Sequence, residues 1–333
     1  MSSEKVFKER LLDPVEKCFF QIEKIIDENI ILLYDNINSF IFQDIDYVKI
    51  ISNIPLWVSQ VGISPEFNCT KDWYEKLRRN ETHPIFGKFI YYYDLNNKIS
   101  AIQDRFSAVM MFMRQLFDIV PSETKYDNKQ YINAIRSSGI KETEAHILLN
   151  YIFVAYASIF DLMSKIAVEQ FEFNKYNFSN YKKMRSADIL YKKSLNNIDP
   201  SLKVDGMLFS EPSVIRQIES FRNEFVHNGT WDFRCCVYEL FINKELKDVI
   251  IYSPDMDELG NFISSGSRNK FYSQANRINI QLPGMIEEAT IILKNTINQL
   301  SSLYRANTTM KINDEYTKEC MDAIRDYYKL SIK

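Results

Sequence analysis

Hydrophobic and polar positions recur along most of this chain at the three- and four-residue spacing of helices. The clearest run extends from Glu142 to Phe171, where apolar side chains wrap most of the way round a helix of about 30 residues, as in the central helix of a bundle. Few glycines and prolines interrupt the chain, which favours long helices. The further predicted helices cover residues 3–36, 44–62, 71–79, 84–120 and 314–330, and another begins at Pro283-Gly284.

The pattern changes after Trp231. Residues 233–242 and 246–252 are rich in Val, Ile, Tyr, Phe and Cys, and Asn243-Lys244-Glu245 lies between them. This composition predicts a small β-hairpin over about residues 233–252. Residues 253–270 are typical of a loop, which could gate a neighbouring site.

Turn-forming residues gather in the segment 121–141, which includes Ser137-Ser138-Gly139. We therefore place a domain boundary there, between a helical N-terminal region of unknown role at 1–140 and a second domain at 141–333. The alternative is a loop within one continuous helical body.

Composition excludes several classes of function. A net charge of −3 argues against a general nucleic-acid coat, so any contact with RNA must be local. Five scattered cysteines and three histidines suggest neither a disulfide framework nor a metal centre, and we expect no cofactor. The N-terminus has no apolar leader and the longest clean apolar run is too short to span a membrane, so we expect a cytoplasmic protein with no membrane partner.

The candidate catalytic residues lie together in the segment 221–231, which reads Phe-Arg-Asn-Glu-Phe-Val-His-Asn-Gly-Thr-Trp. Drawn as a helix over residues 214–227, it places its apolar residues on one stripe, whereas Asn223 and His227 lie on the far side and Arg222 at its edge. Asn228-Gly229 follows as a left-handed stop signal. The three polar residues are therefore predicted to point away from the core of their own subunit.

An arginine can grip a phosphate oxygen with two parallel N–H donors, and a histidine can give or take a proton near neutral pH. Together Arg222 and His227 could drive a metal-free attack of an RNA 2′-hydroxyl on its own phosphodiester. The plainer interpretation is that Arg222 pairs with a carboxylate and His227 caps its own helix, so that neither does chemistry.

The segment Arg222-Asn223-Glu224-Phe225-Val226-His227 resembles the signature of the HEPN superfamily (higher eukaryote and prokaryote nucleotide-binding domains). A long apolar helix upstream, with an acidic residue in its middle, extends the likeness over roughly residues 142–231. The resemblance implies an antiparallel helical bundle that dimerises through its motif face, often with metal-independent RNase activity. It carries Arg222 and His227 over as the catalytic pair, Asn223 as their polar neighbour, and Asp161 as the acidic residue.

For Asp161 two interpretations stay open. One polar line runs along the helix that contains it and includes His146 and Lys165. Asp161 could simply pair with Lys165 on a solvated edge, or it could lie beside Arg222 and His227 and orient one of them.

The segment 175–203 is locally basic, with seven basic residues against two acidic ones and four aromatic residues among them. Such a mixture suits single-stranded RNA, because cations follow the phosphates and rings stack on bases. A solvated surface over buried aromatic rings is the alternative. The candidate RNA-binding residues are Lys182, Lys183, Arg185, Lys192 and Lys193.

The sequence thus predicts a mainly α-helical protein that combines a HEPN-like bundle, a β-hairpin insertion and an extra N-terminal helical region. The expected function is metal-independent endoribonuclease activity in prokaryotic defence or a toxin–antitoxin response, on an RNA substrate and as a homodimer. A non-catalytic helical module for dimerisation or for binding a nucleotide or protein is the alternative. A regulatory protein partner, or restraint of a toxic nuclease by residues 1–140, would also fit the resemblance.

Overall fold

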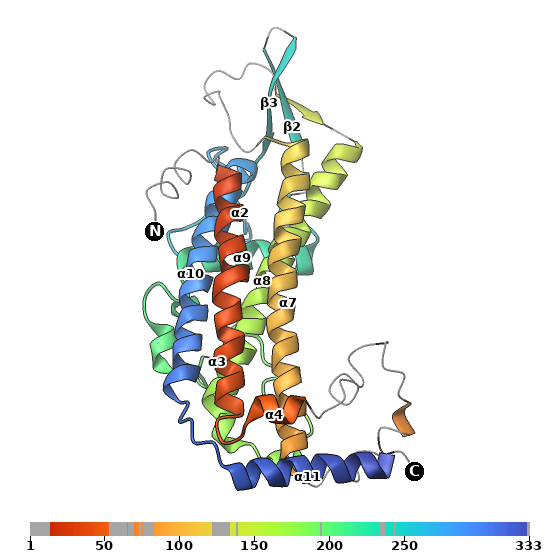
Figure 1. The fold of residues 1–333 in the computed structure, drawn as a ribbon. Helices are drawn as coiled ribbons and strands as arrows, with labels where there is room; N and C mark the ends of the chain where they lie inside the picture. Colours follow the sequence, from red (N-terminus) through yellow and green to blue (C-terminus); the bar gives the residue numbers. More distant parts are fainter. Residues whose placement is uncertain are drawn as a thin grey trace, which may run out of the picture. The chain divides into compact units, whose positions relative to one another are not determined.

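The computed structural model describes residues 14–52, 83–121, 134–137, 139–193, 195–232, 237–242 and 244–331, together with 65, 70–72 and 75. Over these residues the protein is mainly helical, as the pattern predicted, with one small antiparallel sheet (Figure 1). The predicted helical segments at 3–13, 53–62 and most of 71–79 lie outside the described residues.

The α-helices are α2 (Pro14–Lys24), α3 (Ile31–Ile41), α4 (Tyr47–Ile51), α7 (Pro84–Ile119), α8 (Ile140–Glu172), α9 (Ser213–Asn223), α10 (Ile278–Ala306) and α11 (Asp314–Ser331). Two π turns, η1 (Ile25–Ile30) and η8 (Glu224–Asn228), follow α2 and α9. The 3₁₀ turns are η3 (Phe173–Lys175), η4 (Phe178–Asn180), η5 (Tyr191–Lys193), η6 (Pro200–Lys203) and η7 (Leu208–Ser210). Long α7, α8 and α11 confirm the pattern-based predictions.

Helix α10 begins earlier than predicted. Its first residue is Ile278, so Pro283 lies inside the helix instead of opening it. Burial explains the earlier start, because Ile278 and Leu282 are completely buried. Asn279 also anchors this end, since its side chain accepts from the Ile251 amide at 3.1 Å and donates to the Pro121 carbonyl at 2.7 Å.

The density of internal contacts divides the chain into two compact units. Unit 1 comprises residues 1–29, 102–161 and 200–297, and unit 2 comprises residues 30–101, 162–199 and 298–333. Each unit takes residues from both sides of position 141. The predicted division into 1–140 and 141–333 stays a prediction about separately folding parts.

Unit 1 contains the sheet. Strands β2 (Val237–Ile242) and β3 (Glu245–Ile251) form the predicted hairpin, in register from Val237 opposite Ile251, with an irregularity between Leu240 and Phe241. Strand β1 (Ala134–Ser137) pairs antiparallel with β2 and was not predicted, because four residues carry too short a pattern. Below the sheet, the Tyr156 hydroxyl bonds Thr290 Oγ1 at 2.7 Å within the core.

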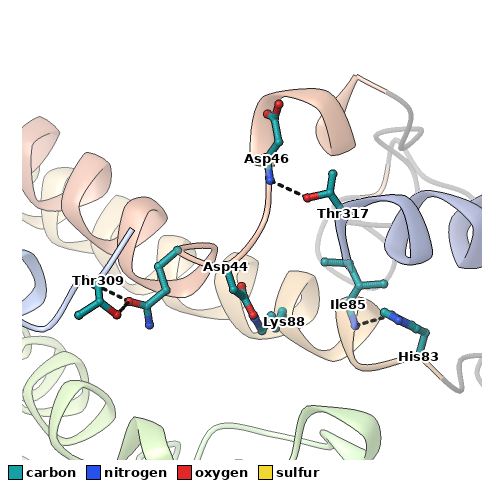
Figure 2. A network of polar contacts seen from close by, with 8 residues as sticks. Asp44, Asp46, His83, Ile85, Lys88, Thr309 and Thr317 are labelled. Atoms are coloured by element: carbon teal, nitrogen blue, oxygen red, sulfur yellow. Dashed lines mark hydrogen bonds and ion pairs between the residues drawn. The ribbon is translucent and has the colours of Figure 1, made fainter. Parts of the chain in front are cut away.

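In unit 2, polar contacts surround the connection between α3 and α4 (Figure 2). Lys88 Nζ lies 2.8 Å from both carboxylate oxygens of Asp44, and the Asp46 amide donates to Thr317 Oγ1 at 3.1 Å. The Thr309 amide donates to the side chain of Gln43 at 2.7 Å. The contact with Lys88 joins the connection between α3 and α4 to α7, and the contacts with Thr309 and Thr317 join it to the chain around the start of α11.

Candidate functional site

The motif helix forms as the sequence predicted, with one change in its last turn. Helix α9 buries Val214, Ile215, Ile218 and Phe221, and Phe225 continues the same apolar stripe. From Glu224 the backbone winds as the π turn η8, which ends at Gly229 with φ +81°. The predicted left-handed stop is therefore confirmed.

The three polar residues of the motif face outward. Asn223 and His227 are exposed and Arg222 is half-buried. Arg222 Nη1 donates to Asn223 Oδ1 at 3.0 Å, which fixes the arginine while leaving further N–H donors for an anion. The part of the chain that the structure describes places no hydrogen-bond partner on the His227 ring.

The π turn changes how Arg222 and His227 face one another. In an α-helix, residues five apart point about 140° away from each other. A π turn closes its hydrogen bonds from residue i+5 to residue i, so residues five apart lie more nearly one above the other. Turn η8 therefore shifts His227 from the position that an α-helical wheel drawn from the sequence gives it.

The loop 253–277 supports this turn. Lys270 Nζ lies 2.7 Å from Glu224 Oε2, and Asn228 Nδ2 donates to the same oxygen at 3.1 Å. One turn earlier in α9, Ser220 Oγ donates to the Gly260 carbonyl at 3.1 Å. The loop and the motif are thus bonded to one another, which favours a supporting role for the loop. Its predicted gating role stays a prediction.

His146 on α8 lies against the inner side of the motif. Its ring centroid is 5.3 Å from that of Phe225, and its buried Nδ1 has no hydrogen-bond partner among the described residues. Burial lowers the pKa of His146, and the Gly229 backbone opposes that shift. Sequence reasoning placed His146 on a polar line without assigning it a role, since nothing in its neighbourhood along the chain points to Gly229.

Asp161 lies far along α8 from the motif. His146 contacts Phe225, and seven residues later the Phe153 ring stacks on Phe221 at 4.6 Å. From His146 to Phe153, α8 therefore runs toward the start of the motif helix and away from His227. Asp161 is eight residues further on, about 12 Å along the helix axis beyond Phe153. This position does not bring Asp161 together with Arg222 and His227, and it favours the interpretation of an edge residue.

Residues 175–199 of the basic segment belong to unit 2, whereas residues 200–203 and the motif belong to unit 1. Tyr181 and Tyr191 are buried, so their rings are not free to stack on bases. Tyr181 donates to Asp94 at 2.6 Å, and the Arg185 guanidinium lies 5.1 Å from the Tyr176 ring centroid. Four of the candidate RNA-binding residues are exposed lysines: Lys182, Lys183, Lys192 and Lys193.

Among the described residues, no group of three or more His, Cys, Asp and Glu side chains could hold a metal ion. The segment Ile140–Lys175, which includes α8, is long and apolar enough to span a membrane, but 61% of its most apolar window is buried inside the protein. Packing in the core accounts for those apolar residues. The predicted cytoplasmic location stays a prediction.

Comparisons with known protein families, with curated proteins and with solved structures find no match. The assignment of a function therefore depends on the geometry of the motif.

Proposed function

We propose that this protein is a metal-independent endoribonuclease of the HEPN type. The observation that carries the proposal is the placement of half-buried Arg222 at the end of α9 and of exposed His227 on the π turn that follows it, while Phe221 and Phe225 are buried in the core. A guanidinium and an imidazole on one accessible face are the two groups that 2′-hydroxyl attack requires.

In the proposed reaction, Arg222 neutralises a non-bridging oxygen of the scissile phosphate, while Asn223 holds the guanidinium at 3.0 Å. His227 either accepts the proton of the attacking 2′-hydroxyl while water protonates the departing 5′-oxygen, or protonates the 5′-oxygen while water accepts the proton of the 2′-hydroxyl. The bond from O2′ to phosphorus forms as the bond from phosphorus to O5′ breaks. The products are a 2′,3′-cyclic phosphate and a 5′-hydroxyl, and prokaryotic defence or a toxin–antitoxin response is the setting that we propose.

The test is incubation of the full chain with total cellular RNA in EDTA, followed by sequencing that distinguishes end chemistry. We expect discrete cleavage with cyclic-phosphate ends, lost in Arg222→Ala and in His227→Ala. Arg216→Ala is the matched control on the same helix, where Arg216 pairs with Glu211 at 3.3 Å. A strict requirement for a divalent metal would contradict the mechanism.

The second candidate function is a non-catalytic module that uses the same face to bind a second copy or a partner protein. Val226 favours it, because this apolar side chain is 49% exposed between the polar residues of the motif. A binding module predicts a change in oligomeric state for Val226→Asp and no RNA cleavage by the wild type. Sedimentation and the cleavage assay distinguish the two candidates.

A further inference from the structure

An open groove in unit 1 lies between the last turns of α7, the first turns of α8 and the residue that follows Gly229. Its volume is about 1090 Å³. Its lining includes Phe112, Glu142, Glu144, His146, Tyr151 and Thr230. Most of this surface is apolar, although it is open to solvent.

A stacked aromatic pair forms part of the groove. The rings of Phe112 and Tyr151 lie 5.2 Å apart at an interplanar angle of 22°. Tyr151 is 53% exposed and its neighbour Ile147 is 45% exposed. Stacking on an aromatic face is the usual way in which proteins hold an unpaired base.

The charge of the groove suits a base and opposes a phosphate. None of its described lining residues is a lysine or an arginine, whereas Glu142 and Glu144 contribute carboxylates. Carboxylates accept hydrogen bonds from the amino groups of bases and repel phosphate. The nearby motif has the complementary property, since Arg222 supplies a cation and no ring.

The groove reaches the end of the motif. Thr230 lines the groove and lies three residues after His227, so the backbone between them spans at most about 10 Å. His146 also lines the groove, and its ring contacts Phe225 of the motif at 5.3 Å. A chain of nucleotides with a phosphate at Arg222 can therefore place a neighbouring base in the groove.

We infer that this groove is a nucleobase subsite, in which an unpaired base next to the scissile phosphate stacks on Tyr151 and directs its amino groups to Glu144. The inference rests on the proposed function for the identity of the phosphate. It adds that the substrate is single-stranded where it is cut, and that recognition of the neighbouring base uses the groove.

The experiment uses the full chain with His227→Ala, which prevents turnover, and a short single-stranded RNA that carries 2-aminopurine. We expect quenching of the 2-aminopurine fluorescence on binding. Adding Tyr151→Ala should weaken binding about tenfold and abolish the quenching. Tyr151→Phe keeps the ring and should preserve both, and Ile291→Ala, which replaces an exposed apolar residue of α10, is the control outside the groove.

A salt series separates the subsite from a general loss of binding. Tyr151→Ala removes no charge, so the slope of log Kd against log salt should stay as in the parent, whereas Arg222→Ala should reduce it. Equal binding by the Tyr151→Ala and parent proteins would overturn the inference. If Tyr151→Ala instead converts a dimer to a monomer in sedimentation, the groove holds a second copy and the inference is also wrong.

Cleavage by the wild type is measured separately, so the two proposals fail in different ways. Cleavage without Tyr151-dependent quenching would support the proposed nuclease and contradict the proposed subsite. Tyr151-dependent quenching without cleavage would support the subsite and move the protein to the class of nucleotide-binding modules.

Discussion

Two segments of this protein combine basic and aromatic residues in sequence, and in the structure these residues are arranged differently in the two segments. In the motif at 221–231, the rings of Phe221, Phe225 and Trp231 pack inward and the polar residues lie outside on a fixed turn. In the segment 175–203, Tyr181 and Tyr191 also pack inward, and the exposed cations are Lys192 and Lys193 on the 3₁₀ turn η5 and Lys182, Lys183 and Arg185 on the chain before it. Of the two segments, only the motif places an arginine and a histidine close together in sequence.

The buried side of the basic segment explains its composition. Glu169 is completely buried and accepts from the Tyr176 hydroxyl at 2.7 Å and from the Ser186 amide at 2.8 Å. Burial raises the pKa of Tyr176 and of Tyr181, so both hydroxyls remain donors at neutral pH. These tyrosines hold the segment against unit 2, and the sequence alone does not distinguish this use of a ring from base stacking.

The largest expected difference between the two regions is in catalysis. His227→Ala should lower the rate of RNA cleavage about 1000-fold, because it removes the proton-transfer group. Replacing Lys182 and Lys193 with glutamine should weaken RNA binding only severalfold at low salt and leave the cleavage chemistry unchanged. Single-turnover kinetics measure both. A larger loss of cleavage rate in the double lysine variant than in His227→Ala would mean that the basic segment, and not the motif, is the catalytic region.

A second prediction concerns stability. Glu169→Ala should destabilise the protein by about 3 kcal/mol, because it removes two hydrogen bonds to a buried carboxylate. Asp188→Ala is the control, since its pair with Lys183 is exposed and its loss should change stability by less than about 0.5 kcal/mol. Urea unfolding measures the difference, and equal midpoints would show that Glu169 does not hold the segment in place.

The support of the motif by the loop 253–277 gives a third, smaller effect. Lys270→Ala should slow cleavage about threefold with little change in KM, because Glu224 loses the ion pair that positions the turn. Lys270→Arg should restore the rate. Arg268→Ala in the same loop is the control, and an equal loss there would mean that the loop acts through its general charge.

The smallest effect is a pH dependence from His146. Because burial lowers its folded pKa below the ordinary value, the unfolded chain binds more protons as the pH falls below about 6.5. Its contribution to stability is therefore present above that pH and is lost as the solution becomes acidic. Unfolding midpoints at pH 7 and pH 5 should differ more in the wild type than in His146→Gln, which does not titrate.

Sequence reasoning predicted the elements with long patterns. Helices α7, α8 and α11 and the hairpin of β2 and β3 follow from apolar spacing and turn residues. The motif helix and its stop at Gly229 were also predicted, so the outward direction of His227 could be predicted from the sequence. These features depend on local patterns, which a single sequence contains.

The missed features depend on residues distant in sequence. Strand β1 exists because β2 lies beside it, and α10 starts at Ile278 because its first turn is buried and Asn279 is anchored. The contacts of His146 with Gly229 and of Lys270 with Glu224 join positions with no common pattern. The π turn at Glu224 was missed because helical periodicity assumes an α-helix.

The interleaved composition of the units has a consequence for the order of folding during synthesis. Tyr156 in unit 1 bonds Thr290, and Asn36 in unit 2 bonds Ser301, so each core joins residues separated by more than a hundred positions. Contacts of such separation make folding slow, and they form only after α10 has left the ribosome. The motif at 221–231 is therefore translated before its surroundings can be completed, which delays any activity until most of the chain has been made.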